Sequence, residues 1–94
     1  TSYSESEISN FKKDLQKAEK RIAELEREIS IVETGISEID TTMENHSGEF
    51  SKLSELGEKR KEFQTRKDTF EEEWLELSDR AEAIRSVLKS LGRQ

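Results

Sequence analysis

The residues that could do chemistry in this chain are mostly Lys and Arg, and the chemistry they suit is contact with phosphate groups. One basic group lies toward the two ends of the chain and comprises Lys12, Lys13, Lys17, Lys20, Arg21, Arg80, Arg85, Lys89 and Arg93. A second group lies in the second half and comprises Lys59, Arg60, Lys61, Arg66 and Lys67. Acids are interspersed among both, so each group fits either a solvated face of mixed charge or a nucleic-acid contact.

Other chemistry finds little support. His46 is the only histidine, and a metal site there would need Glu44 or Glu49 beside it. One imidazole with carboxylates on a loop makes a poor metal site, so we expect a solvated loop and no metal. Cysteine is absent, no glycine-rich phosphate loop is present, and no histidine has a nucleophile as partner. We therefore expect no catalytic residue, no cofactor in this chain and no enzyme activity.

The elements that position the basic groups follow from two stripes of apolar residues. In the first half apolar residues recur at steps of three and four. The second half has the same steps, with two basic residues, Arg60 and Lys67, among the apolar ones. The first stripe is Ile8, Phe11, Leu15, Ala18, Ile22, Leu25, Ile29, Val32, Ile36, Ile39 and Met43. The second is Leu53, Leu56, Arg60, Phe63, Lys67, Phe70, Trp74, Leu77, Ala81, Ile84, Leu88 and Leu91. Both stripes predict long helices that pack along a heptad seam.

A short polar segment between the stripes predicts a turn, and a short turn forces the helices to run antiparallel. We expect an all-α fold, an antiparallel two-helix coiled-coil hairpin, with a linker at 1–6 and the hairpin at 7–94. Its parts are a helix at about 7–43, a turn at 44–48 and a helix at about 49–91. Ser4 and Glu7 have the spacing of a capping box, Ser47 suits the cap of the second helix, and Asn45 or Gly48 suits a left-handed position.

The register follows if His46 lies at the apex. Trp74 then pairs with Ala18, Phe11 pairs with Ala81, and Phe63 pairs with Ile29. Large residues meet small ones in the first two pairs, so Phe11, Ala18, Trp74 and Ala81 are the predicted structural core. On one flank the same register sets three opposite charges together: Asp14–Arg80, Arg21–Glu73 and Glu28–Arg66.

Several residues allow two interpretations. Arg60 and Lys67 stand on the seam, where their stems could pack with the charged heads in solvent, or where they could join a phosphate-contacting patch. Gly35 and Gly57 fall at one height and are either tolerated surface glycines or a soft point. Leu88 and Leu91 extend past their partners, so either Tyr3 covers them or they are free to dock a partner.

Composition sets the outer limits. The chain has 94 residues, of which 30% are hydrophobic and 40% are charged, and its net charge of −6 arises between Glu33 and Glu58. One end of the hairpin should therefore be acidic. No apolar run approaches the roughly 20 residues of a membrane span, so we expect no membrane contact. Absence of cysteine fits a reducing, cytoplasmic setting. The chain begins at Thr1, and we expect it to be part of a longer protein.

Four stretches of the chain together resemble the C-terminal coiled-coil domain of ABC-F ATPases, the ATP-binding-cassette proteins of the Uup type. The most specific is Glu73-Trp74-Leu75-Glu76-Leu77, an acidic stretch around one tryptophan. The others are Ser2-Tyr3, the run Ala23-Glu24-Leu25-Glu26-Arg27-Glu28-Ile29 and Phe50-Ser51-Lys52-Leu53. The chain departs from the family in its net acidity and its acidic tip.

The resemblance implies a parent with two ATP-binding cassettes, which bind ATP and Mg²⁺, and an appended domain that is not catalytic. Its implied partners are those cassettes and DNA, ribosomal RNA or the ribosome during translation. Because the tip is acidic, we expect phosphate contact from Lys12, Lys13, Lys17, Lys20, Arg21, Arg85 and Lys89, or from Lys59, Arg60, Lys61, Arg66 and Lys67. Two alternatives stay open: a structural spacer or protein-docking arm, and a dimerisation coil formed by opening the hairpin, although a monomeric hairpin is favoured.

Overall fold

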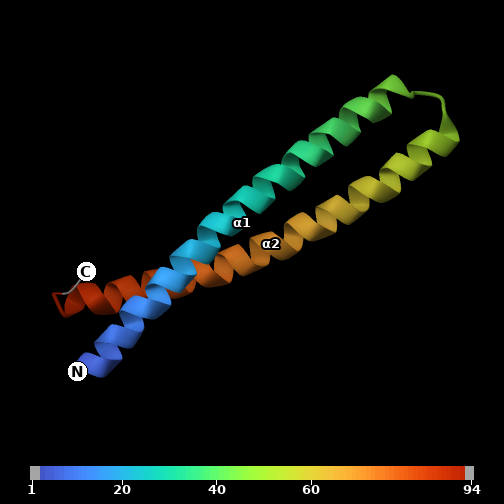
Figure 1. Ribbon diagram of the computed structural model, residues 1–94. Helices are drawn as coiled ribbons and strands as arrows, with labels where there is room; N and C mark the ends of the chain where they lie inside the picture. Colours follow the sequence, from blue (N-terminus) through green and yellow to red (C-terminus); the bar gives the residue numbers. More distant parts are fainter. Residues whose placement is uncertain (1–2, 93–94) are drawn as a thin grey trace.

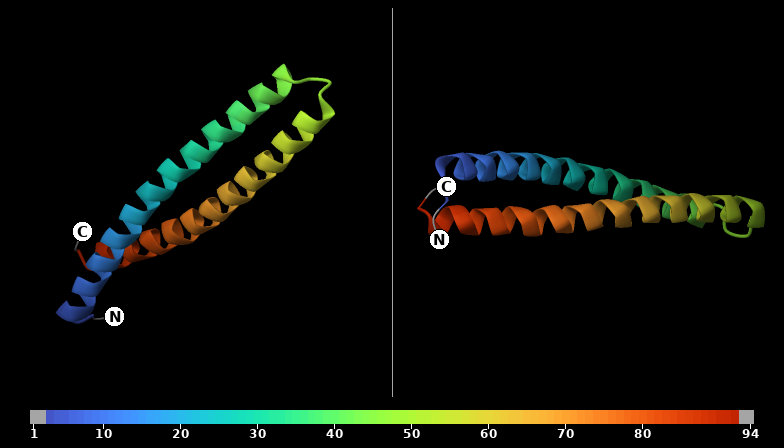
Figure 2. Two further views of the ribbon diagram at one scale, coloured as in Figure 1. Left: turned by 45° about the vertical axis from the view of Figure 1, so that its right-hand side comes forward. Right: turned by 90° about the horizontal axis from the view of Figure 1, so that it is seen from below.

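The computed structural model describes residues 3–92 as two helices, α1 (Glu5–Asn45) and α2 (Phe50–Ser90), each of 41 residues. They run antiparallel and are joined by one short turn, with both chain ends at the opposite end of the molecule (Figure 1). The molecule measures 66 × 16 × 15 Å. The views in Figure 2 show the helices winding about each other. The predicted all-α hairpin is confirmed.

The start of α1 is held by the predicted capping box. The Ser4 hydroxyl accepts a hydrogen bond from the Glu7 amide at 3.1 Å, and the Glu7 carboxylate accepts one from the Ser4 amide at 3.0 Å. These bonds satisfy two amides that a helix start otherwise leaves without partners. As a result α1 begins at Glu5, two residues before the expected bound.

The turn occupies His46 to Glu49 and places the apex beyond His46. Gly48 has a φ of 92°, a left-handed conformation that suits glycine, as expected. The Glu49 amide donates to the His46 carbonyl at 3.0 Å, which closes the turn. The prediction that Ser47 caps α2 is wrong, because α2 starts at Phe50 and its N-cap residue is Glu49, whose side chain makes no capping bond.

The buried core is unevenly shared between the helices. On α1 it includes Ala18, Leu25 and Val32, whereas the buried residues of α2 all lie near its end: Ala81, Ile84 and Leu88. Between residues 50 and 80 the seam residues of α2 are only half-buried. Each helix is covered by only one other helix, so part of a large seam side chain stays exposed to solvent.

A compact cluster closes the open end of the hairpin. Ile8, Ile84 and Leu88 form its buried part, and Tyr3, Phe11, Leu15 and Leu91 pack around them. The rings of Tyr3 and Phe11 meet edge to face with centroids 5.2 Å apart. Tyr3 thus helps to cover Leu88 and Leu91, which was one of the two interpretations of these leucines. Leu88 is 2% exposed and is not available as a docking surface.

In the middle of the seam the expected pairing is wrong, whereas Ile8 and Ile84, which the same register pairs, lie in one cluster at the open end. The Phe63 ring packs on Gly35, where an added Cβ would lie 2.8 Å from Phe63 Cδ2 and closer still to Cε2. Gly35 lies six residues nearer the turn than Ile29, the predicted partner. Trp74 likewise donates from Nε1 to Glu26 at 3.2 Å, well beyond Ala18. Trp74 is half-buried, as is Phe11, whereas Ala18 and Ala81 are buried.

The physical reason for this offset is the direction in which helical side chains lean. Each Cα–Cβ bond tilts toward the N-terminus of its own helix, so α2 side chains lean toward the turn and α1 side chains lean away from it. Contacts therefore form between an α2 residue and α1 residues nearer the turn than the position directly opposite. The position of the turn adds to the offset, because a turn at 46–49 instead of 44–48 moves the apex past His46.

A ladder of polar contacts runs along one flank of the seam. Arg60 contacts Asp40 at 2.7 Å, and Lys67 contacts Glu33 at 3.3 Å. The Trp74–Glu26 hydrogen bond is the next rung, and the partners on both helices are spaced by seven residues. The basic seam residues of α2 therefore have acidic partners on α1, and their charged heads are not free in solvent.

Candidate nucleic-acid interface

The outward side of α1 carries a row of unpaired cations near the open end. Lys13, Lys20 and Arg27 are spaced by seven residues, and Lys17 lies between the first two, so all four share one face of the helix. All are exposed, and none forms an ion pair with another residue of the described range 3–92. At about 1.5 Å per residue the row is about 21 Å long. We call these four residues the basic face.

Glu24 also lies on this side of α1 and contacts Arg21 at 3.4 Å, and the exposed acids of the same stretch are Asp14, Glu19, Glu26 and Glu28. Arg27 was not among the sequence-based candidates. Its spacing of seven residues from Lys20 was the signal that could have found it, once the helix face had been considered instead of the run of neighbouring bases.

The outward side of α2 has the opposite charge. Its bases are Lys61 and Lys89, and its exposed acids are Glu55, Glu58, Glu62, Asp68, Glu72, Glu76, Asp79 and Glu82. We call these acids the acidic face. Charges that alternate along the sequence are therefore separated in space, because helical geometry sends bases and acids to different sides of the hairpin.

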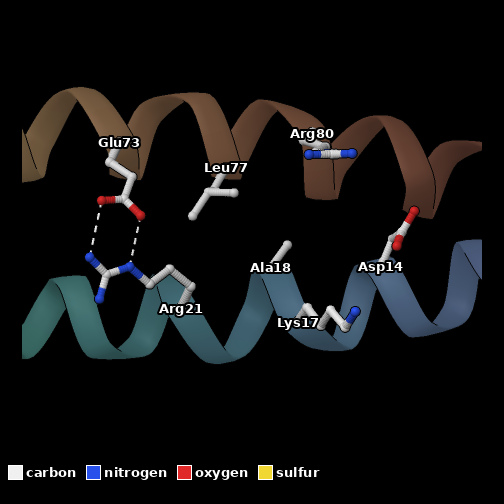
Figure 3. Close-up of a pocket in the computed structure, with 7 residues that line it drawn as sticks. All are labelled: Asp14, Lys17, Ala18, Arg21, Glu73, Leu77 and Arg80. Carbon is white, nitrogen blue, oxygen red and sulfur yellow. Dashed lines mark hydrogen bonds and ion pairs between the residues drawn. The ribbon is translucent and has the colours of Figure 1, made fainter.

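Four of the candidate cations are held by carboxylates of the opposite helix. Arg21 donates two hydrogen bonds to the Glu73 carboxylate, of 2.7 Å from Nε and 3.0 Å from an Nη nitrogen (Figure 3). Arg60 and Lys67 belong to the ladder described above, and Arg85 contacts Glu19 at 2.9 Å. A phosphate group would have to displace a carboxylate to reach any of these cations, so they are poor candidates for nucleic-acid contact.

The pKa values at these pairs reflect the same bonds. The hydrogen bond from Arg21 lowers the pKa of Glu73, and the hydrogen bond from Arg60 lowers the pKa of Asp40. The carboxylates in turn raise the pKa of Arg21 and of Arg60. Both pairs therefore stay ionised at neutral pH. Their side chains remain about two-fifths exposed, so their main effect is on register.

The groove in Figure 3 lies between the helices next to the basic face. Asp14, Lys17, Arg21, Glu73 and Arg80 line it, with Ala18 and Leu77 as its floor. Of the three predicted flank pairs only Arg21–Glu73 forms. In the described part of the chain no ion pair joins Asp14 to Arg80, and none joins Glu28 to Arg66. Arg66 instead lies over the Phe63 ring, 5.4 Å from its centroid.

The second basic group does not form one patch. Arg60 and Lys67 turn toward α1, Lys59 lines a groove beside Phe63, and Lys61 points outward. Lys12 and Lys89 are exposed and have no ion-pair partner within residues 3–92. Of the other candidate residues, Ser2 and Arg93 lie outside the described residues.

The tip carries one hydrogen-bonded side-chain pair and, in the described residues, no cluster of metal ligands. His46 Nδ1 lies 2.7 Å from a Glu49 carboxylate oxygen. Across the described residues, no group of three or more His, Asp or Glu side chains could hold a metal ion. The same range contains no helix whose length and apolar character would let it cross a membrane.

Comparison with known proteins identifies the family of this hairpin. The ABC transporter C-terminal domain family matches residues 10–79, which is most of the chain. The chain belongs to this family. The resemblance to a C-terminal domain of an ABC protein, drawn from short stretches of sequence, is thereby confirmed. No similar curated protein and no similar solved structure was found.

As an ABC transporter C-terminal domain, the chain is an accessory domain of an ABC protein. The matched segment contains the basic face, the turn, the polar ladder and Trp74, and it excludes the buried residues at the end of α2. This part of the hairpin is therefore what the domain shares with its family, and the cluster around Ile84 and Leu88 lies beyond the match.

Proposed function

We propose that this ABC transporter C-terminal domain is a non-catalytic accessory domain of an ABC-F ATPase, and that it contacts the phosphate backbone of DNA or ribosomal RNA. The observation that carries the proposal is the basic face. Lys13, Lys17, Lys20 and Arg27 are exposed and unpaired on one side of a rigid helix. Cations that have no carboxylate partner lose little when they bind a phosphate instead of water.

The distribution of charge favours one orientation on a nucleic acid. The basic face would meet the phosphates, while the acidic face of α2 points away from them and repels a second strand. Such a split sets orientation more than affinity. The acidic tip would likewise avoid phosphates, so contact would be limited to the half of α1 near the open end.

In this proposal the ATP-binding cassettes of the parent chain are the direct neighbours of the domain, and they bind the ATP and Mg²⁺. The parent would act in the cytoplasm, on the ribosome during translation or on DNA. The hairpin would supply reach and phosphate contact, because its described residues form an arm 66 Å long with chemistry suited to binding only.

The test is fluorescence anisotropy of the 94-residue chain with labelled RNA and DNA duplexes. If the domain makes four phosphate contacts, raising the salt from 50 to 200 mM should weaken its binding to DNA by about a hundredfold. The triple variant Lys13→Glu, Lys17→Glu, Lys20→Glu should lose this binding.

A matched control reverses the same number of charges elsewhere: Lys59→Glu, Lys61→Glu and Lys89→Glu. It should keep most of the affinity, and circular dichroism should show both triple variants folded. Equal losses in the two triple variants would mean that net charge alone drives binding. Absence of binding by the unaltered chain at low salt would reject phosphate contact and leave a spacer.

A further inference from the structure

We infer that a groove around Trp74 docks a basic amphipathic helix of a protein partner. The groove lies between the helices on the flank of the polar ladder. Glu26 and Ile29 line it from α1, and Glu71, Trp74 and Leu75 line it from α2. None of these residues belongs to the basic face, so the inference goes beyond phosphate contact and does not rest on it.

The floor of the groove is apolar and open to solvent. Leu75 is 56% exposed, and Trp74 and Ile29 are half-buried. Trp74 lines the groove and is only half-buried, so part of its indole is open to solvent. The hydrogen bond from Trp74 Nε1 to Glu26 at 3.2 Å holds the ring in this position. A fixed aromatic surface is a suitable anchor for an apolar side chain, since little side-chain entropy is lost on binding.

The rim of the groove is acidic. Glu26 and Glu71 line it directly, and Glu72 and Asp79 lie one turn from Leu75 on the same side of α2. On this flank Lys67 and Arg85 are already held by Glu33 and Glu19. The negative charge around the apolar floor is therefore not neutralised by neighbouring cations.

This combination selects the occupant. An apolar floor with an acidic rim complements a helix that has a stripe of Leu or Ile flanked by Lys or Arg. A nucleic acid would be repelled from the same rim, and an acidic helix would be repelled as well. The domain would then bind nucleic acid on the outward side of α1 and a basic protein segment on the ladder flank.

The experiment uses Trp74 as its own reporter, because it is the only tryptophan of the chain. The 94-residue chain is titrated at physiological salt with a synthetic amphipathic helical peptide of Leu and Lys. A matched peptide has Glu in place of every Lys. The Leu–Lys peptide should shift Trp74 emission to the blue and saturate, and the Leu–Glu peptide should leave the emission unchanged.

Two variants locate the binding. Leu75→Ala should weaken the peptide by about tenfold, since most of one apolar contact is lost. Ile31→Ala is the matched control, because Ile31 is 65% exposed and lies outside this groove, and its affinity should equal that of the unaltered chain. Both residues are exposed, so neither change should unfold the hairpin.

Three results would overturn the inference. Equal weakening by Leu75→Ala and Ile31→Ala would show general attraction to an acidic protein. Binding of the Leu–Glu peptide would show that the rim does not select charge. Sedimentation could also reveal a dimer of the unaltered chain that Leu75→Ala abolishes. The groove would then bind a second copy of this chain instead of a basic helix.

Discussion

Gly35 and Gly57 form a natural test of the structure, because they are equally placed in the sequence pattern and unequally placed in space. An added Cβ on Gly35 would lie 2.8 Å from Phe63 Cδ2, well inside the usual carbon–carbon contact of about 3.5–4.0 Å. An added Cβ on Gly57 would meet nothing within 4 Å. We therefore expect Gly57→Ala to stabilise the hairpin and Gly35→Ala not to stabilise it.

The magnitudes follow from two opposing effects. Either substitution should gain about 1 kcal/mol from the higher helix propensity of Ala. Only Gly35→Ala should also lose about 1–3 kcal/mol, because the Phe63 ring must move away. Gly57→Ala should thus raise the melting temperature by about 4–8 °C in a chain of this size. Gly35→Ala should leave it unchanged or lower it.

The measurement is urea and thermal unfolding of both variants, followed by circular dichroism. A double variant, Gly35→Ala with Phe63→Leu, supplies the internal control: the smaller side chain should relieve the clash, and the double-mutant cycle should show coupling. If Gly35→Ala stabilised the hairpin as much as Gly57→Ala, the Gly35–Phe63 contact would be refuted. The pairing of Phe63 with Ile29 would then return as the better register.

Three further outcomes are expected. Arg60→Leu with Lys67→Leu should raise the unfolding midpoint in urea but admit other registers or oligomers, visible by sedimentation, because polar seam residues trade stability for specificity. Glu73→Gln should lower the melting temperature at neutral pH, and the difference from the unaltered chain should shrink in strong acid. The reason is that Arg21 lowers the pKa of Glu73 in the folded state, so the stabilisation is present above the unfolded pKa of about 4.3 and lost as pH falls through the folded value. Ser4→Ala should cost about 1 kcal/mol in urea unfolding, since it removes the capping box.

Local features of the hairpin could be predicted from the sequence because their causes are local. The alternating steps of three and four predicted the two helices, and the polar segment between them predicted the turn. Ser4 and Glu7 cap α1 as their spacing of three residues indicates. The Arg21–Glu73 pair was also predicted, because both residues flank the seam and long polar side chains tolerate a small error in register.

The site was less predictable than the fold. Lys13, Lys17 and Lys20 were candidates, but the sequence did not separate them from Arg60 or Lys67, which look equally basic along the chain. Only the packed hairpin shows which cations have carboxylate partners. The groove at Trp74 was likewise not foreseen, since heptad spacing alone placed that residue in the core.

The sequence by itself determined the periodicity, the number of helices, the capping at the N-terminus and the family of the domain. The tertiary structure decided which residues touch across the seam, because contact depends on the lean of side chains and on the position of the turn. It set Phe63 on Gly35 and Trp74 beside Glu26. It also decided which charges are free, since an ion pair needs a partner at one position on the other helix, and a shift of one helical turn changes every partner.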